Sequence, residues 1–134
     1  MSHELINPEG LPPAVGFSHA VLPATGRTVY LGGQAGIRAD GTVPEGIVAQ
    51  FDLACENVVK ALAAAGGSPE HLVSMQIFAT DTDGYAAALP ALGAAYRKHF
   101  GKHYPAIAYL GVSRLFEPSA LVELVCIAVV PDQR

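Results

Sequence analysis

Residues 104–115 read Tyr-Pro-Ala-Ile-Ala-Tyr-Leu-Gly-Val-Ser-Arg-Leu, and residues 121–130 read Leu-Val-Glu-Leu-Val-Cys-Ile-Ala-Val-Val. Successive side chains of a strand point to opposite faces of a sheet, so the second stretch is apolar on both faces. Its single charged residue is Glu123. A strand that is apolar on both faces must be covered on both. We expect two helices to cover one face and a second subunit to cover the other.

The remaining chain alternates strand and helix patterns. Apolar residues recur at three- and four-residue steps over 46–65 and predict a helix that Gly66 and Gly67 end. A second helix is expected over 83–100, with Pro90 marking a kink or a late start. Further strands are predicted over 17–22, 28–33 and 72–80, the first two as a hairpin.

The order of these elements predicts an α+β fold, in which both helices lie on one side of a sheet. The 134 residues fit a single domain over 1–134. Hydrophobic residues make up 51% of the chain and charged residues 15%, which favours burial of part of the surface against another subunit.

Composition also argues against several classes of function. The net charge is −4, and the eight Lys and Arg residues are scattered, so we expect no nucleic-acid partner. No apolar run is long enough to cross a membrane, and the start of the chain shows no secretory pattern, so a cytoplasmic protein is expected. Cys55 and Cys126 fit buried reduced thiols, and no residue cluster has metal-ligand spacing.

Several short pieces, in their order and spacing, resemble the RidA (YjgF) family, which hydrolyses reactive enamines and imines. The pieces are Gly16-Phe17-Ser18, Gly33-Gln34, the first helix, Tyr96 and the two closing strands, and they span about Asn7 to Val130. The resemblance implies a chorismate-mutase-like fold with a mixed sheet and a barrel-cored homotrimer. It also implies small-molecule clefts between subunits and no cofactor.

The family residues that carry the chemistry are altered here. Position 107, where deaminating members hold the arginine that grips the substrate carboxylate, is Ile107. The resemblance further matches the family's usual cysteine to Tyr109, its tyrosine to Phe17, its helical asparagine to Gly93, and the glutamate that orients water to Val125. Such hydrolysis needs a cation for the carboxylate and a group that positions water. Ile107 and Val125 offer neither.

Other positions of the expected cleft match the family. Gly33 and Gln34 fit residues beside the ligand, and Arg114 and Glu123 fit a second arginine and an acidic position. An ion pair between Arg114 and Glu123 is the favoured interpretation of this buried carboxylate. His19 also lies near the cleft, where a surface role is favoured over one as donor or proton carrier.

For each of three cleft residues, two interpretations stay open. Ile107 fits either plain core or a pocket wall, and Gly33 fits a close backbone approach as well as a ligand site. The Tyr109 hydroxyl either points into the cleft or packs between subunits.

Three functions follow from the resemblance. The first is binding of a small metabolite, without the usual deamination of 2-iminobutanoate or 2-iminopropanoate. The second is hydrolytic deamination of an altered enamine or imine, with Arg114 in the carboxylate role. The third, endoribonuclease or translation-inhibitor activity, is least favoured because the chain is acidic.

Overall fold

The longest strand, β7 (Val122–Pro131), is the centre of the main sheet in this computed structural model, which describes residues 2–133. It pairs antiparallel with β3 (Gly26–Tyr30) on one side and with β5 (Leu72–Ala79) on the other. The edge strand β6 (Ala106–Gly111) runs parallel to β5, and the short β4 (Gln34–Ala35) pairs with β7 near Glu123. The sheet is therefore mixed, as predicted.

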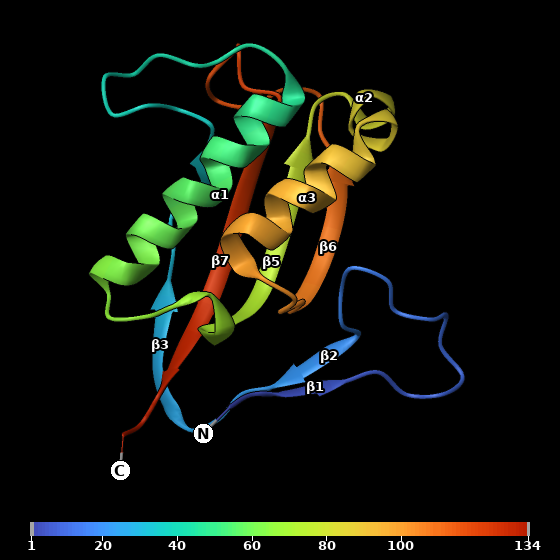
Figure 1. Cartoon of the computed structure of the whole chain (residues 1–134), viewed down its shortest axis with the longest axis vertical. Coiled ribbons are helices and arrows are strands. Elements are labelled where there is room, and N and C mark those ends of the chain that lie inside the picture. The colour runs from blue at the N-terminus through green and yellow to red at the C-terminus, as the bar shows by residue number, and fades with distance from the viewer. Residues whose placement is uncertain (1, 134) are drawn as a thin grey trace.

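Two long helices cover one face of this sheet (Figure 1). They are α1 (Ile47–Ala64) and α3 (Leu89–Phe100), and they pack against each other. A short 3₁₀ turn, η1 (Pro69–His71), leads into β5. No helix within residues 2–133 has both the length and the hydrophobicity that crossing a membrane requires. The α+β fold with both helices on one face is confirmed.

The predicted second helix is divided in two. A short helix, α2 (Thr82–Ala87), begins after the cap Asp81, whose carboxylate accepts a hydrogen bond from the Gly84 amide at 2.9 Å. The next helix, α3, begins at Leu89 and has Pro90 in its first turn. Proline suits that turn because its missing N–H would have no partner inside the helix. Pro90 thus marks a late start.

The predicted pairing of the first two strands is wrong. The strand β2 (Ala20–Leu22) pairs with β1 (Glu4–Ile6), where no strand was predicted, while β3 pairs with β7. The hydrogen bond that the Ala24 amide donates to His3 Nδ1, at 3.0 Å, helps to fix this arrangement. The β1–β2 ribbon extends below β5 and β6, and a short link joins β2 to the start of β3 (Figure 1).

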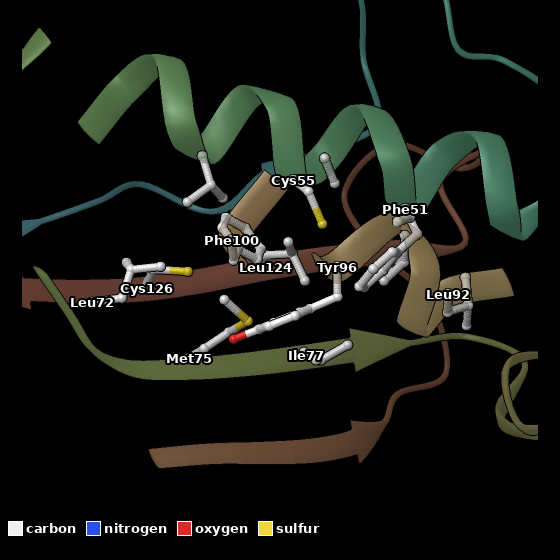
Figure 2. Packing of buried hydrophobic residues seen from close by; sticks show 14 of the residues in the cluster. Phe51, Cys55, Leu72, Met75, Ile77, Leu92, Tyr96, Phe100, Leu124 and Cys126 are labelled. Carbon is white, nitrogen blue, oxygen red and sulfur yellow. The ribbon is translucent and has the colours of Figure 1, made fainter. Parts of the chain in front are cut away.

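The side chains of β7 divide between the two faces as the alternation predicts. Val122, Leu124, Cys126 and Ala128 are at most 1% exposed and lie under the helices. Figure 2 shows Leu124 near Cys55 of α1 and Tyr96 of α3, and Cys126 beside Leu72. Both cysteines are free and buried, and burial raises the pKa of Cys126 to about 12. They belong to the core.

The other face of the sheet is much more open. Its alternate residues, which we call the open sheet face, are half-buried or exposed, and most are apolar. Tyr30 is 79% exposed, and Leu110 is 39% exposed. The open sheet face consists of Tyr30, Ser74, Gln76, Phe78, Ala108, Leu110, Glu123, Val125 and Ile127.

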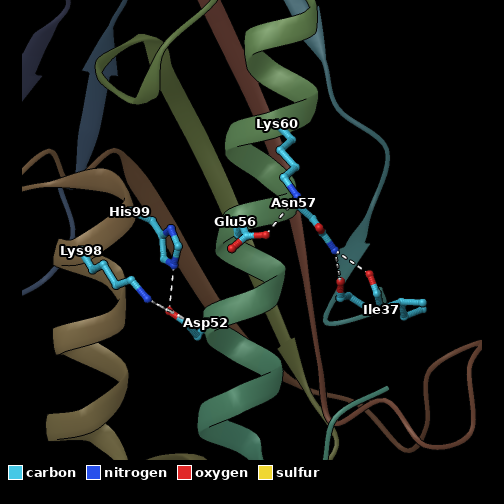
Figure 3. Close-up of polar contacts among 8 residues, drawn as sticks. Ile37, Asp52, Glu56, Asn57, Lys60, Lys98 and His99 are labelled. Atoms are coloured by element: carbon cyan, nitrogen blue, oxygen red, sulfur yellow. Dashed lines mark hydrogen bonds and ion pairs between the residues drawn. The ribbon is translucent and has the colours of Figure 1, made fainter. Parts of the chain in front are cut away.

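Polar contacts tie α1 to its surroundings (Figure 3). The Asp52 carboxylate lies 2.8 Å from His99 Nε2 and 3.3 Å from Lys98 Nζ, both on α3. Asn57 donates hydrogen bonds to the carbonyls of Ala35 and Ile37, each at 3.0 Å. The first contact joins the two helices, and the second holds the segment after β4 against α1.

We predict that Asp52→Asn lowers stability at neutral pH by about 0.5–1 kcal/mol, because the carboxylate is partly exposed. Partial burial opposes ionisation, but hydrogen bonds from His99 and Lys98 hold the pKa of Asp52 below its ordinary 3.8. The stabilisation is present above pH 3.8 and is lost as the pH falls through the lower folded-state pKa.

Urea unfolding of both proteins at pH 7 and near pH 2.5 measures this difference. The gap between wild type and variant should close at the lower pH. Glu56→Gln is the control, since Glu56 forms only an exposed ion pair with Lys60. A gap that is equal at both pH values contradicts the prediction.

Candidate functional site

A cavity of about 490 Å³ opens on the helix side of the fold, between the loop before β2, the helices α2 and α3, and β6. Its walls are almost entirely apolar or aromatic. The lining residues are Val15, Gly16, Phe17, Phe51, Ile77, Tyr85, Leu89, Pro90, Leu92, Gly93, Tyr96, Arg97, Tyr104, Ile107 and Tyr109. Phe17, Gly93, Ile107 and Tyr109, all predicted as cleft residues, therefore meet in one place.

Ile107 and Tyr109 are two residues apart on β6, so both side chains face the helices. Ile107 is half-buried and packs against the core while it lines the cavity. The Tyr109 ring lies against Tyr85, with 4.3 Å between ring centroids. The Ile107 side chain therefore both packs against the core and forms part of the cavity wall.

Two of the tyrosine hydroxyls at the cavity are held by backbone carbonyls. Tyr109 donates a long hydrogen bond to the Thr82 carbonyl at 3.5 Å, and Tyr96 donates one to the His103 carbonyl at 2.7 Å. Burial, with the nearby carboxylates of Asp81 and Asp83, raises the pKa of Tyr109. Burial also raises the pKa of Tyr96. These phenols stay protonated at neutral pH and can act as hydrogen-bond donors.

Ser18 places Phe17 in the cavity wall. The Ser18 amide donates a hydrogen bond to the Pro105 carbonyl at 2.9 Å, and its hydroxyl donates one to the Tyr104 carbonyl at 2.6 Å. Ser18 is 4% exposed and forms a bridge to Ala106, at the start of β6. These bonds hold the neighbouring Phe17 ring beside the strand that carries Ile107.

His19 lies outside the cavity. Its Nε2 atom is 2.7 Å from the Pro12 carbonyl oxygen, and its ring meets Phe17 edge to face at 5.0 Å between centroids. It borders a separate hollow together with Ser74 and Gln76 of β5. The surface role that the sequence favoured for His19 stays a prediction.

A second group of predicted cleft residues gathers around the pairing of β4 with β7. Gly33 and Gln34 precede or begin β4, and Glu123 and Val125 lie on the open sheet face. A β-carbon built on Gly33 would lie 2.5 Å from Glu123 Oε2, so glycine makes room for this carboxylate. Gln34 donates a 3.3 Å hydrogen bond to the Gly32 carbonyl. None of these residues lines the cavity.

The expected ion pair between Arg114 and Glu123 is absent from the described chain. Arg114 lies beyond the end of β6, in an exposed loop, instead of beside β7. It also does not line the cavity. Within residues 2–133, no group of three or more His, Cys, Asp or Glu side chains is arranged to hold a metal ion.

Sequence reasoning missed Arg97, which is the one charged residue among the described residues that line the cavity. It stands four positions after Gly93 on α3, and residues at this spacing share one side of a helix. A β-carbon built on Gly93 would lie 3.2 Å from Arg97 Nη1. The spacing was visible in the sequence, but the cavity beside it was not.

Comparison with known proteins supports the sequence resemblance. The family model described as Endoribonuclease L-PSP matches residues 9–130. The chain is 32% identical over 128 residues to the 2-iminobutanoate/2-iminopropanoate deaminase of Capra hircus, covering 93% of this chain and 88% of the relative. It is 31% identical over 118 residues to RutC family protein UK114 of Drosophila melanogaster, covering 87% and 80% respectively.

Solved structures agree in fold. The conserved Rid family protein YyfB of Yersinia pestis superposes with a TM-score of 0.84 at 32% identity, covering 97% of this chain and all (100%) of that one. RidA from an Antarctic Psychrobacter superposes with a TM-score of 0.69 at 30% identity, covering 95% and 99%.

We predict that Ser18→Ala loosens the loop that carries Phe17, because the variant loses the hydroxyl donor to the Tyr104 carbonyl. The free energy of unfolding should fall by about 1–2 kcal/mol. Hydrogen exchange should accelerate at the Ser18 amide. Ser119→Ala, which removes an exposed hydroxyl, is the control. Unchanged exchange at residue 18 would show that the backbone bond alone holds the loop.

Proposed function

The chain belongs to the RidA (YjgF) family, and we propose that it binds a small metabolite in the cavity beside Ile107 without efficient deamination of 2-iminobutanoate or 2-iminopropanoate. The observation that carries this proposal is the place of Ile107 in the cavity wall, where the resemblance puts the carboxylate-binding arginine. An arginine there would offer a carboxylate two parallel hydrogen bonds. Isoleucine offers none, and burying an unpaired carboxylate costs several kcal/mol.

We further propose that the ligand site is completed by a neighbouring subunit in a homotrimer. The predicted cleft residues form two groups in one chain, one around the cavity and one around Gly33 and Glu123. A neighbour that covers the open sheet face would bring its own copy of one group towards the other. The exposed apolar side chains of this face, such as Tyr30 and Leu110, support such a contact.

A second candidate function is hydrolysis of a different imine or enamine, and Glu123 favours it. Its carboxylate is half-buried beside Gly33 and forms no ion pair with another described residue. It lies on the same face of β7 as Val125, two residues away. Although position 125 is a valine, Glu123 therefore gives this face a carboxylate that can take a proton from water.

In that reaction, the water oxygen bonds to the imine carbon while the carboxylate accepts a proton. The carboxylate returns this proton to the nitrogen, which gives an amine and a hydroxyl on the same carbon. The hydroxyl proton then passes to the nitrogen, the C–N bond breaks, and ammonia leaves as the carbonyl product forms. Arg114, the sequence-based candidate for the substrate carboxylate, lies outside the cavity of its own chain. An endoribonuclease role is the least supported, because the chain is acidic and its cations are scattered.

We predict slow loss of 2-iminobutanoate with the wild-type protein and a gain of about tenfold or more with Ile107→Arg, since the variant supplies a charge-assisted pair. The imine is generated in place by a second enzyme, and its disappearance is timed. Ile107→Ala, which enlarges the cavity without adding a donor, should give no gain. A wild-type rate equal to that of an arginine-containing relative would refute the proposal.

We also predict that native mass spectrometry finds three chains per particle. Ile127→Asp should disrupt this assembly, because it buries an unpaired carboxylate in the proposed contact. Val48→Asp, on the exposed side of α1, should leave the assembly intact. A wild-type protein that remains a single chain at micromolar concentration argues against the trimer.

A further inference from the structure

The charge of the cavity comes from one side chain. Arg97 is the charged member of its described lining, and its guanidinium forms no ion pair within residues 2–133. Its neighbour Lys98, by contrast, pairs with Asp52 of α1 at 3.3 Å. A cation at an apolar opening, without a carboxylate beside it, is available to bind an anion.

Gly93 allows the guanidinium to reach this position. The Nη1 atom of Arg97 lies 3.2 Å from where a β-carbon on Gly93 would stand, so the side chain extends back over the preceding turn. Side chains in helices lean towards the N-terminal end in this way. A larger residue at position 93 would push the guanidinium outward, away from the cavity.

The other residues that line the cavity indicate the size and polarity of a suitable ligand. Aromatic rings of Phe17, Tyr85, Tyr96 and Tyr104 and the Ile107 side chain surround the space. Its volume of about 490 Å³ falls within the range of small-molecule sites and exceeds what a short-chain imino acid fills. The wall therefore suits an aromatic or branched apolar body.

Charges near the cavity favour one orientation of a bound acid. Asp81 and Asp83 lie close enough to Tyr109 to act on its hydroxyl, so that end of the cavity disfavours an anion. Arg97 stands on α3 with Gly93, apart from these carboxylates in the sequence and on a different helix. An acidic ligand would place its charge beside Arg97 and its apolar end towards Tyr85 and Tyr109.

We propose that Arg97 is the anion anchor of this cavity, which selects organic acids with an aromatic or branched apolar body. The anchor is thus displaced from β6, where Ile107 stands, to α3. The inference rests on the proposed binding function, since it concerns the same cavity. It adds the chemical class of the ligand and the residue that recognises its charge.

Isothermal titration with a matched pair of probes tests the inference. The pair is 3-phenylpropanoate and its neutral amide, 3-phenylpropanamide, which share one apolar body. Wild type should bind the acid about tenfold more tightly than the amide, as a charge-assisted hydrogen bond allows. Arg97→Ala should remove this preference and leave the affinity for the amide unchanged.

Three further variants test the charge, the shape and the position of the Arg97 side chain. Arg97→Lys should keep part of the preference, because it retains the charge but loses the planar fork. Gly93→Leu, whose side chain extends well beyond a β-carbon, should reduce the preference by displacing the guanidinium. Lys60→Ala, which removes an exposed cation of α1 outside the cavity, should change nothing.

The outcomes separate this inference from the function on which it rests. If wild type does not prefer the acid, or Arg97→Ala keeps the preference, the anchor is refuted while binding in the cavity stands. Ile107→Trp, which places a larger ring in the cavity wall, should weaken the binding of both probes. If both probes bind that variant as tightly as wild type, or if neither binds wild type, the cavity proposal fails together with the anchor.

Discussion

The alternation of side chains along β7 and β6 is the constraint on which the rest of the structure depends. On β7, one set of residues is sealed beneath the helices, and the other set forms the open sheet face with Glu123. On β6, the same alternation turns Ile107 and Tyr109 towards the helices and into the cavity wall. A shift of one residue in either strand would exchange these roles. The position of the cavity and the division of the cleft residues into two groups both follow from it.

Much of the fold could be predicted because its main elements are long and strongly periodic. The apolar stripe of α1 and the doubly apolar β7 leave few alternatives. The pairing of β2 could not be predicted in the same way, since its three residues carry little pattern. It depends on contacts of distant side chains, such as the acceptor that His3 supplies to Ala24. The sequence predicted a kink or a late helix start at Pro90. It did not predict a separate α2 with its own cap.

The candidate site shows the same division. The resemblance was enough to bring Phe17, Ile107 and Tyr109 together, and the cavity places all three in its wall. The expected Arg114–Glu123 pair was wrong because Arg114 lies in a loop beyond β6, where strand register does not apply. Arg97 was missed because its relevance depends on the space beside α3 and on the small size of Gly93. Periodicity reports which face a residue occupies, but it does not report a cavity at that face.

The chain has the fold of its family, and the proposed anion anchor lies on α3 instead of β6. Ile107 lines the cavity on β6, Arg97 lines it on α3 without an ion pair within residues 2–133, and the Glu123 carboxylate lies beside Gly33. A crystal structure with 3-phenylpropanoate tests this account most directly. The account predicts the phenyl ring against Ile107 and the carboxylate on Arg97. A carboxylate bound by any other cation, or a ligand bound outside this cavity, would contradict it.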